Sequence, residues 1–196
     1  AISYVGDDRY AHYNNVTVSD VGTTWTSNAR LYVGNGGSYN TLTIDNGGQV
    51  NVNEQLYVGS YGGRPGNNST VTVTGAGSKL VVSGSGHFQR GPNNKFLVTD
   101  AGYASFGGSL NFGNAGVLHN DLSVTGGGQL LTNGFIFSQQ YSGGDMLVSG
   151  GSIMTNTGNA TLASAGHVGG STYTIDGAGT AWTNKVITLN SKNCIL

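Results

Sequence analysis

Apolar and polar residues alternate with a period of two in short segments that recur along the whole chain. In seven segments of seven residues the first and third positions are apolar, the third is Val or Ile in every copy, and the second is usually Thr or Ser. Such alternation is typical of a β-strand with one buried face. The segments begin about 26 residues apart, a repeat length typical of a solenoid. They occupy residues 16–22, 42–48, 71–77, 96–102, 122–128, 146–152 and 173–179.

Two further apolar sites follow each segment before the next one begins. The more distant is a pair that marks a second strand, with the members Leu31/Val33, Leu56/Val58, Leu110/Phe112, Phe135/Phe137, Ala160/Leu162 and Ile187/Leu189, and with Phe88 in the remaining repeat. Between the two strands lies a shorter apolar site, for which we predict the members Trp25, Val50, Leu80, Ala104, Leu130, Ile153 and Trp182. Each repeat therefore contains three short β-type segments.

These short segments are joined by turns rich in Gly, Asn and Ser, which leave no room for a crossover helix. We predict an all-β fold, a single-stranded right-handed parallel β-helix (β-solenoid) of about seven coils of roughly 26 residues. Residues 1–196 are expected to form a single domain. The seventh position of the segment is Gly in six copies and Ser152 in the other, which predicts a corner with positive φ.

Both ends of the sequence fall inside a repeat. Residues 2–6 match the second-strand segments at 31–34 and 56–59, and the last such segment is 187–190. An uncovered terminal coil would expose a row of unpaired hydrogen-bonding groups. We therefore expect either further repeats beyond these ends or end-to-end stacking of copies.

The charge content narrows the classes of partner. Only 9% of the residues are charged, and 8 Lys and Arg stand against 9 Asp and Glu. This balance provides no basic stripe for nucleic acid and no polybasic segment for a membrane surface, and no apolar stretch is long enough to span a bilayer. The hydrophobic fraction of 37% is too high for a disordered chain of such low charge. The single cysteine, Cys194, excludes an internal disulfide.

The repeats are similar to those of a family of bacterial surface proteins. The pattern is carried by residues 57–59 leading into 70–78, by residues 42–50, and by residues 173–182. On these stretches the chain resembles the type V secretion (autotransporter) and PEP-CTERM-associated repeat family, most clearly over residues 16–83 and 171–190. The resemblance implies an exported β-helical stalk or passenger region of an adhesin-like protein, extracellular or on the cell surface. It implies no catalytic residue.

Some parallel β-helices degrade polysaccharides, a reaction that needs carboxylates clustered on one face. The acids Asp20, Asp45, Asp100 and Asp176 fall at the fourth or fifth position of the segment, where other copies have Asn, Ser, Thr or Gly. That exchange is typical of turn residues that bind local backbone amides. Asp20 and Asp45 lie in adjacent coils, so a carboxylate pair or a calcium site is the alternative interpretation there.

The four histidines, His12, His87, His119 and His167, do not have the spacing of a metal site. We therefore predict no metal, no cofactor and no catalytic residues.

One corner is more distinctive than the repeat background. Residues 64–68 and 90–94 contain both prolines of the chain, each preceded closely by an arginine and followed by two asparagines. We expect the prolines to stack and Tyr61, Arg64, Gln89 and Arg90 to form a protruding contact surface for a ligand or partner. The alternative is a pair of solvated turns that tolerate insertions. The asparagines of this corner are expected to form an amide ladder, with the members Asn15, Asn40, Asn68, Asn94 and Asn120.

These patterns predict a non-enzymatic extracellular structural or adhesive protein: a stalk, an adhesin passenger segment or a fibre subunit. Low charge reduces repulsion between like surfaces, so the expected partners are copies of the chain, end to end or side by side, or cell-surface or matrix polysaccharide. The alternative is a carbohydrate-binding or polysaccharide-degrading β-helix protein.

Overall fold

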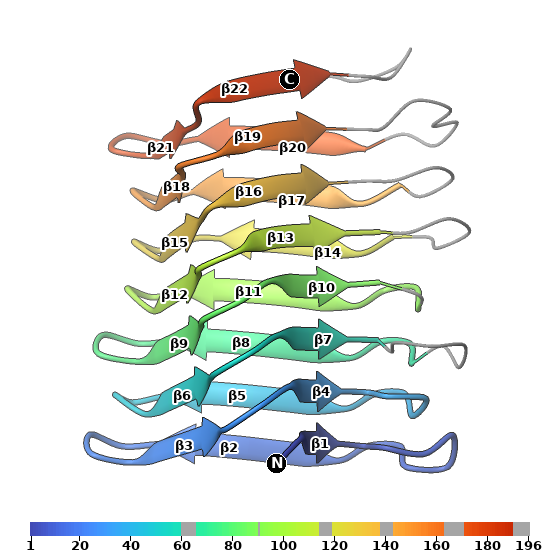
Figure 1. Ribbon diagram of the computed structural model, residues 1–196. Coiled ribbons are helices and arrows are strands. Elements are labelled where there is room, and N and C mark those ends of the chain that lie inside the picture. The colour runs from blue at the N-terminus through green and yellow to red at the C-terminus, as the bar shows by residue number, and fades with distance from the viewer. Residues whose placement is uncertain (60–65, 90, 114–118, 138–142, 163–170, 190–196) are drawn as a thin grey trace.

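The structure, a computed structural model, describes residues 1–59, 66–89, 91–113, 119–137, 143–162 and 171–189. Every regular element in these ranges is a β-strand, and the strands form three parallel sheets. The chain visits the three sheets in turn and ascends one level with each coil (Figure 1). The near strands run to the right and the far strands to the left as the chain ascends, so the β-helix is right-handed (Figure 1). The predicted fold class is confirmed.

Each coil contributes one strand to each sheet. Sheet A has eight strands: β1 (Ser3–Val5), β4 (Leu31–Val33), β7 (Leu56–Val58), β10 (Gly86–Phe88), β13 (Ser109–Phe112), β16 (Gly134–Phe137), β19 (Asn159–Leu162) and β22 (Val186–Leu189). Sheet B has seven: β2 (Asn15–Ser19), β5 (Thr41–Asp45), β8 (Thr70–Thr74), β11 (Lys95–Thr99), β14 (Asp121–Val124), β17 (Asp145–Ser149) and β20 (Thr172–Asp176). Sheet C has seven: β3 (Thr24–Ser27), β6 (Gln49–Val52), β9 (Lys79–Val82), β12 (Tyr103–Phe106), β15 (Gln129–Thr132), β18 (Ile153–Asn156) and β21 (Ala181–Thr183).

The pairing register agrees with the sequence repeat. The first positions of the seven segments are aligned across sheet B, in the order Val16, Leu42, Val71, Phe96, Leu122, Met146 and Tyr173. In sheet A, β1 pairs with β4 so that Val5 lies beside Val33, as the match of residues 2–6 predicts. Like residues therefore stack on like along the axis.

One predicted core residue is wrong. Ile153 is 45% exposed, and Met154 instead lies in register with Leu130 and Trp182. The prediction placed the inward residue seven residues after Met146, whereas the connection from sheet B to sheet C takes eight or nine residues in every coil. From the first position of the segment to the inward residue of sheet C the chain advances nine residues in three coils (Val16 to Trp25, Val71 to Leu80, Tyr173 to Trp182) and eight in the others (Leu42 to Val50, Phe96 to Ala104, Leu122 to Leu130, Met146 to Met154).

The glycine expectation at these turns is only partly right. Positive φ falls on the fifth and seventh positions in the longer turns, as at Gly75 and Gly77, but on the fifth and sixth in the shorter ones, as at Asn46 and Gly47. In a shorter turn the seventh residue is small for a different reason. A Cβ on Gly48 would lie 2.1 Å from the carbonyl oxygen of Val18 in the coil below. Close backbone approach, and not φ, therefore requires glycine there.

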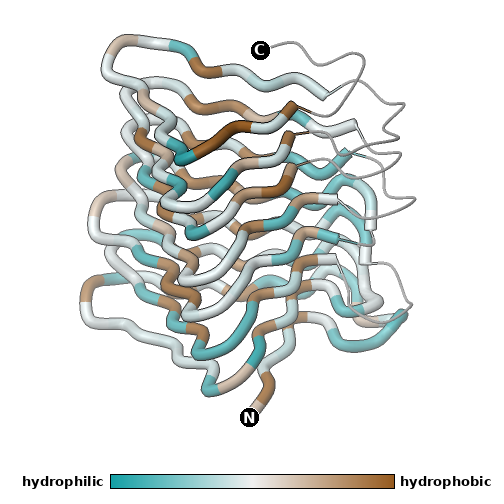
Figure 2. The backbone as a smooth tube through the Cα atoms, turned by 45° about the horizontal axis from the view of Figure 1, so that its top comes forward, coloured by the Kyte–Doolittle hydropathy of each residue, from teal (hydrophilic) through white to brown (hydrophobic). Residues whose placement is uncertain are grey.

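The core is a set of columns that run the length of the solenoid. Hydrophobic stretches repeat at the same place in successive coils (Figure 2). Phe88, Phe112 and Phe137 stack in adjacent strands of sheet A, with ring centroids 4.7 and 4.9 Å apart. Phe96 of sheet B packs on Phe88 at 5.2 Å. Aromatic rings therefore fill the middle coils, whereas Leu, Val and Ile fill the first ones.

Candidate functional site

The contact surface predicted around the two prolines lies mostly outside the described residues. Tyr61, Arg64 and Arg90 belong to the ranges that the structure does not describe. Gln89 is half-buried, and its backbone N–H donates to the carbonyl oxygen of Val58 at 3.2 Å. The stacking of the prolines also lies outside the described residues because Pro65 does.

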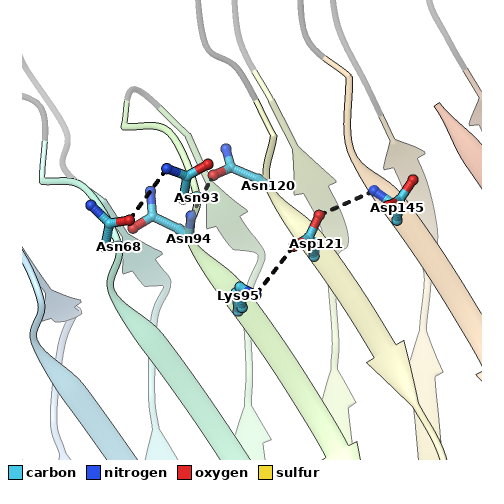
Figure 3. A network of polar contacts seen from close by, with 7 residues as sticks. All are labelled: Asn68, Asn93, Asn94, Lys95, Asn120, Asp121 and Asp145. Carbon is cyan, nitrogen blue, oxygen red and sulfur yellow. Dashed lines mark hydrogen bonds and ion pairs between the residues drawn. The ribbon is translucent and has the colours of Figure 1, made fainter. Parts of the chain in front are cut away.

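The asparagine ladder exists, but its register and its bonding differ from the prediction. Asn40 is in line with Asn14, not Asn15, and Ser69 takes the place expected for Asn68. Each side-chain oxygen accepts from a backbone N–H of the coil before. The Asn94 Oδ1 accepts from the Ser69 N–H at 2.8 Å, and the Asn120 Oδ1 accepts from the Asn94 N–H at 2.8 Å (Figure 3 draws the second bond). The Asn40 Oδ1 accepts both from the Asn14 N–H at 3.0 Å and from the Asn14 side-chain amide at 2.9 Å. The side chains of Asn40, Asn94 and Asn120 are buried and hold the corner together. Their role is structural.

The residue before each of these positions has left-handed backbone geometry. The φ angles in this column lie between 54° and 61°, at Tyr13, Tyr39, Asn68, Asn93 and His119. The rings of Tyr13 and Tyr39 stack at 5.0 Å, and the Asn93 Nδ2 donates to the Asn68 Oδ1 at 3.2 Å (Figure 3). Asn68 is half-buried and the rest of the column is exposed, and these two contacts each join side chains of neighbouring coils.

A second aromatic column lies on the outer face of sheet A. Tyr4, Tyr32, Tyr57 and His87 occupy the middle position of four adjacent strands, with centroids 5.1, 5.0 and 4.8 Å apart. Tyr32 and Tyr57 are buried despite facing outward because a ring covers each of their faces. Burial lowers the pKa of His87 below its usual value, because desolvation disfavours the imidazolium.

Asp20 and Asp45 differ in how their carboxylates are bonded, and the Asp45 Oδ1 is buried without a hydrogen-bond partner in the described part of the chain. The Asp20 Oδ1 accepts from the Asn46 amide at 2.8 Å, and the residue in register with Asp45 is Ser19. The backbone carbonyl of Asp45 closes its own turn by accepting from the Gly48 N–H. The geometry therefore shows Asp20 and Asp45 acting as turn residues.

Two more carboxylates link coils in sheet B. The Asp121 carboxylate forms an ion pair with Lys95 at 3.6 Å and accepts from the Asp145 N–H at 3.1 Å (Figure 3). The Asp100 Oδ2 accepts from the Thr74 hydroxyl at 3.1 Å. Within the ranges that the structure describes, no three His, Cys, Asp or Glu residues are grouped so that they could hold a metal ion.

A groove lies on the outer face of sheet C. It has a volume of about 620 Å³, within the range of roughly 300–1,000 Å³ usual for ligand sites. Its walls are outward side chains of β9, β12 and β15, namely Lys79, Val81, Tyr103, Ser105 and Gln129, together with the turn residues Gly77, Ser78 and Ala101.

The groove results from the two turn lengths. The connection from β8 to β9 has the extra residue and projects beyond the connections from β5 to β6 and from β11 to β12 (Figure 1). Gly77 and Ser78 therefore form a ledge beside the outer face of the next two coils. Lys79, Tyr103 and Gln129 are consecutive in register along this face.

The polar groups of the groove are free to meet a ligand. Lys79 forms no ion pair with any described residue, and neither the Tyr103 hydroxyl nor the Gln129 amide is hydrogen-bonded within the described ranges. Val81, 36% exposed, lies in the neighbouring row, in register with Ser105, and provides an apolar surface beside them. A row of three different polar groups thus adjoins a small apolar patch.

The sequence reasoning did not find this groove. The signal for it is the extra residue between Val71 and Leu80, since the following turns are one residue shorter. Lys79 and Tyr103 are also the outward residues that directly follow these turns. Unequal turns followed by large polar residues would have pointed to this face.

No protein-family model, curated protein or solved structure matches the chain. No helix in the described ranges is long and apolar enough to cross a membrane.

Proposed function

We propose that the protein is a non-enzymatic structural and adhesive β-solenoid of the cell surface or extracellular space, acting as a stiff segment whose side faces make contacts. The observation that carries the proposal is the unbroken alignment of like positions in all three sheets. Each coil pairs with its neighbours in all three sheets, so bending the rod would break ladder hydrogen bonds and core contacts together. The similarity of the repeats to those of bacterial surface proteins supports the location.

The placement of the acidic residues also favours a structural role. The described carboxylates of Asp20, Asp100 and Asp121 each bond to a neighbouring coil. A glycoside hydrolase usually needs two such groups directed at one substrate bond. In this chain these three acidic residues hold neighbouring coils together.

The partners we propose are copies of the chain or surface polysaccharide. The outer faces carry mostly Thr, Ser, Asn and Tyr, groups that exchange hydrogen bonds with a neutral partner without the cost of desolvating charges. The free polar groups of the sheet C groove favour polysaccharide over a second copy.

The experiment combines retention and turnover. The purified chain is passed over immobilised neutral and acidic polysaccharides, its association is followed by sedimentation velocity, and reducing ends are assayed in the same mixtures. We expect retention or concentration-dependent association without new reducing ends. Cleavage that is lost in Asp20→Asn or Asp45→Asn, but kept in the control Asp176→Asn, would replace the proposal with a polysaccharide-degrading function.

A further inference from the structure

We infer that the groove on the outer face of β9, β12 and β15 binds an extended acidic polysaccharide, such as a uronate chain, lying along the solenoid axis. The inference rests on the adhesive function proposed above and names its site and ligand class. It concerns the residues Lys79, Val81, Tyr103 and Gln129.

The first argument is the chemistry of the groove. Sugar rings present hydroxyls that donate and accept, and C–H faces that pack on apolar groups. The Tyr103 hydroxyl donates and accepts, the Gln129 amide does both, and Val81 supplies an apolar contact. Because none of these polar groups is hydrogen-bonded to a described residue, a ligand gains their bonds without breaking internal ones.

The second argument is charge. Lys79 is exposed and unpaired among the described residues, and the neighbouring carboxylate of Asp100 is directed to Thr74 of the adjacent strand. The one unpaired cation at the groove therefore fits a carboxylate on the ligand. A charge-assisted bond of this kind is stronger than a neutral one.

The third argument is shape. The groove is an open channel across three coils and not an enclosed cavity. Adjacent strands are about 4.8 Å apart, so Lys79, Tyr103 and Gln129 form a row with a spacing close to the length of one sugar unit. A linear chain can place successive units opposite successive coils, which a compact small molecule cannot do.

The experiment titrates the full chain with oligogalacturonates and with neutral dextran oligomers by calorimetry at low and moderate salt. We expect the uronate to bind, to bind more weakly as salt rises, and to outcompete dextran. Lys79→Gln should weaken uronate binding about tenfold, the loss expected for one hydrogen bond to a charged group, and Tyr103→Ala should reduce it further.

The matched control is Lys95→Gln, which removes the same charge from sheet B, where Lys95 pairs with Asp121. It should leave uronate affinity unchanged. If Tyr103→Ala fails to fold by circular dichroism, Tyr103→Phe tests the hydroxyl alone.

The outcomes separate the two proposals. Uronate binding that Lys79→Gln and Tyr103→Phe leave unchanged overturns the groove assignment but keeps the adhesive function. Absence of uronate binding in the wild type overturns the inference, and if the chain also neither associates with itself nor binds other polysaccharides, the proposed function fails as well. Equal affinity for dextran and uronate overturns the acidic ligand class.

Discussion

The rings of Phe88 and Phe112 lie 4.7 Å apart with their planes 12° from parallel, one directly above the other in successive coils. The ring separation matches the strand spacing of a sheet, so the stack is a direct consequence of parallel pairing in register. The same rule makes columns of Tyr, Asn and Thr on other faces. A change at one position is therefore felt first by the coils above and below.

Phe112→Ala should destabilise the fold by about 3–5 kcal/mol, since it removes a buried ring and leaves a cavity between Phe88 and Phe137. Denaturant unfolding followed by circular dichroism measures the change. Leu97→Ala, at an outward position of sheet B, should cost about 1 kcal/mol or less. Equal costs for the two variants would contradict the inward assignment of Phe112.

Asn94→Ala should cost about 2–4 kcal/mol, because it leaves the buried Ser69 N–H and Gly91 carbonyl without partners. The comparison is Asn51→Ala, on the outer face of sheet C, where we expect little loss. If both variants unfold at the same denaturant concentration, the asparagine corner does not contribute to stability as described.

Gly48→Ala should destabilise more than Gly22→Ala, although only Gly22 has positive φ. A Cβ at Gly48 meets the Val18 carbonyl, whereas one at Gly22 meets open space. Overpacking costs about 1–3 kcal/mol or more against a backbone atom that cannot yield, and the strain at Gly22 costs about 1 kcal/mol. Thermal unfolding of the two variants gives the order, and the reverse order would show that φ dominates at both turns.

His87 should make stability fall at acidic pH. Its pKa is lowered in the folded state, so the unfolded chain binds the proton more readily, and stability declines as the pH falls below about 6.5 towards the folded pKa. Protonation also disfavours the contact of its Nδ1 with the Asn111 amide at 3.4 Å. His87→Phe keeps a ring against Tyr57 and should flatten the dependence of Tm on pH between 7 and 5. An unchanged slope would assign the acid sensitivity to other groups.

Much of the fold could be predicted because the repeat is local. Alternation in each segment sets which residues face inward, and the period sets which residues stack, so the registers of Val16 with Leu42 and of Tyr4 with Tyr32 follow from counting. Counting failed at Ile153, which lies seven residues after Met146. Ile153 and Met154 are both apolar, and the register with Leu130, eight residues after Leu122, shows that Met154 faces the core.

The candidate site depended on the lengths of the turns between sheets B and C and on the pairing of the strands. Lys79, Tyr103 and Gln129 are unremarkable polar residues in the sequence, and they become a row only because their strands pair in register. Their groove exists because one turn projects past the next. The asparagines likewise predict a ladder of side-chain amides. In the structure, however, the side-chain oxygens of Asn94 and Asn120 accept hydrogen bonds from buried backbone N–H groups of the corner.

The sequence by itself determined that this is a parallel β-solenoid with about 26 residues per coil, because alternation and period are properties of the chain order. Tertiary structure alone decided which corner residues are buried, where positive φ falls, and where the outer surface is hollowed. These three features depend on how closely neighbouring coils approach one another. A one-residue difference between turns changes the distance between coils locally but leaves the repeat in the sequence unaltered.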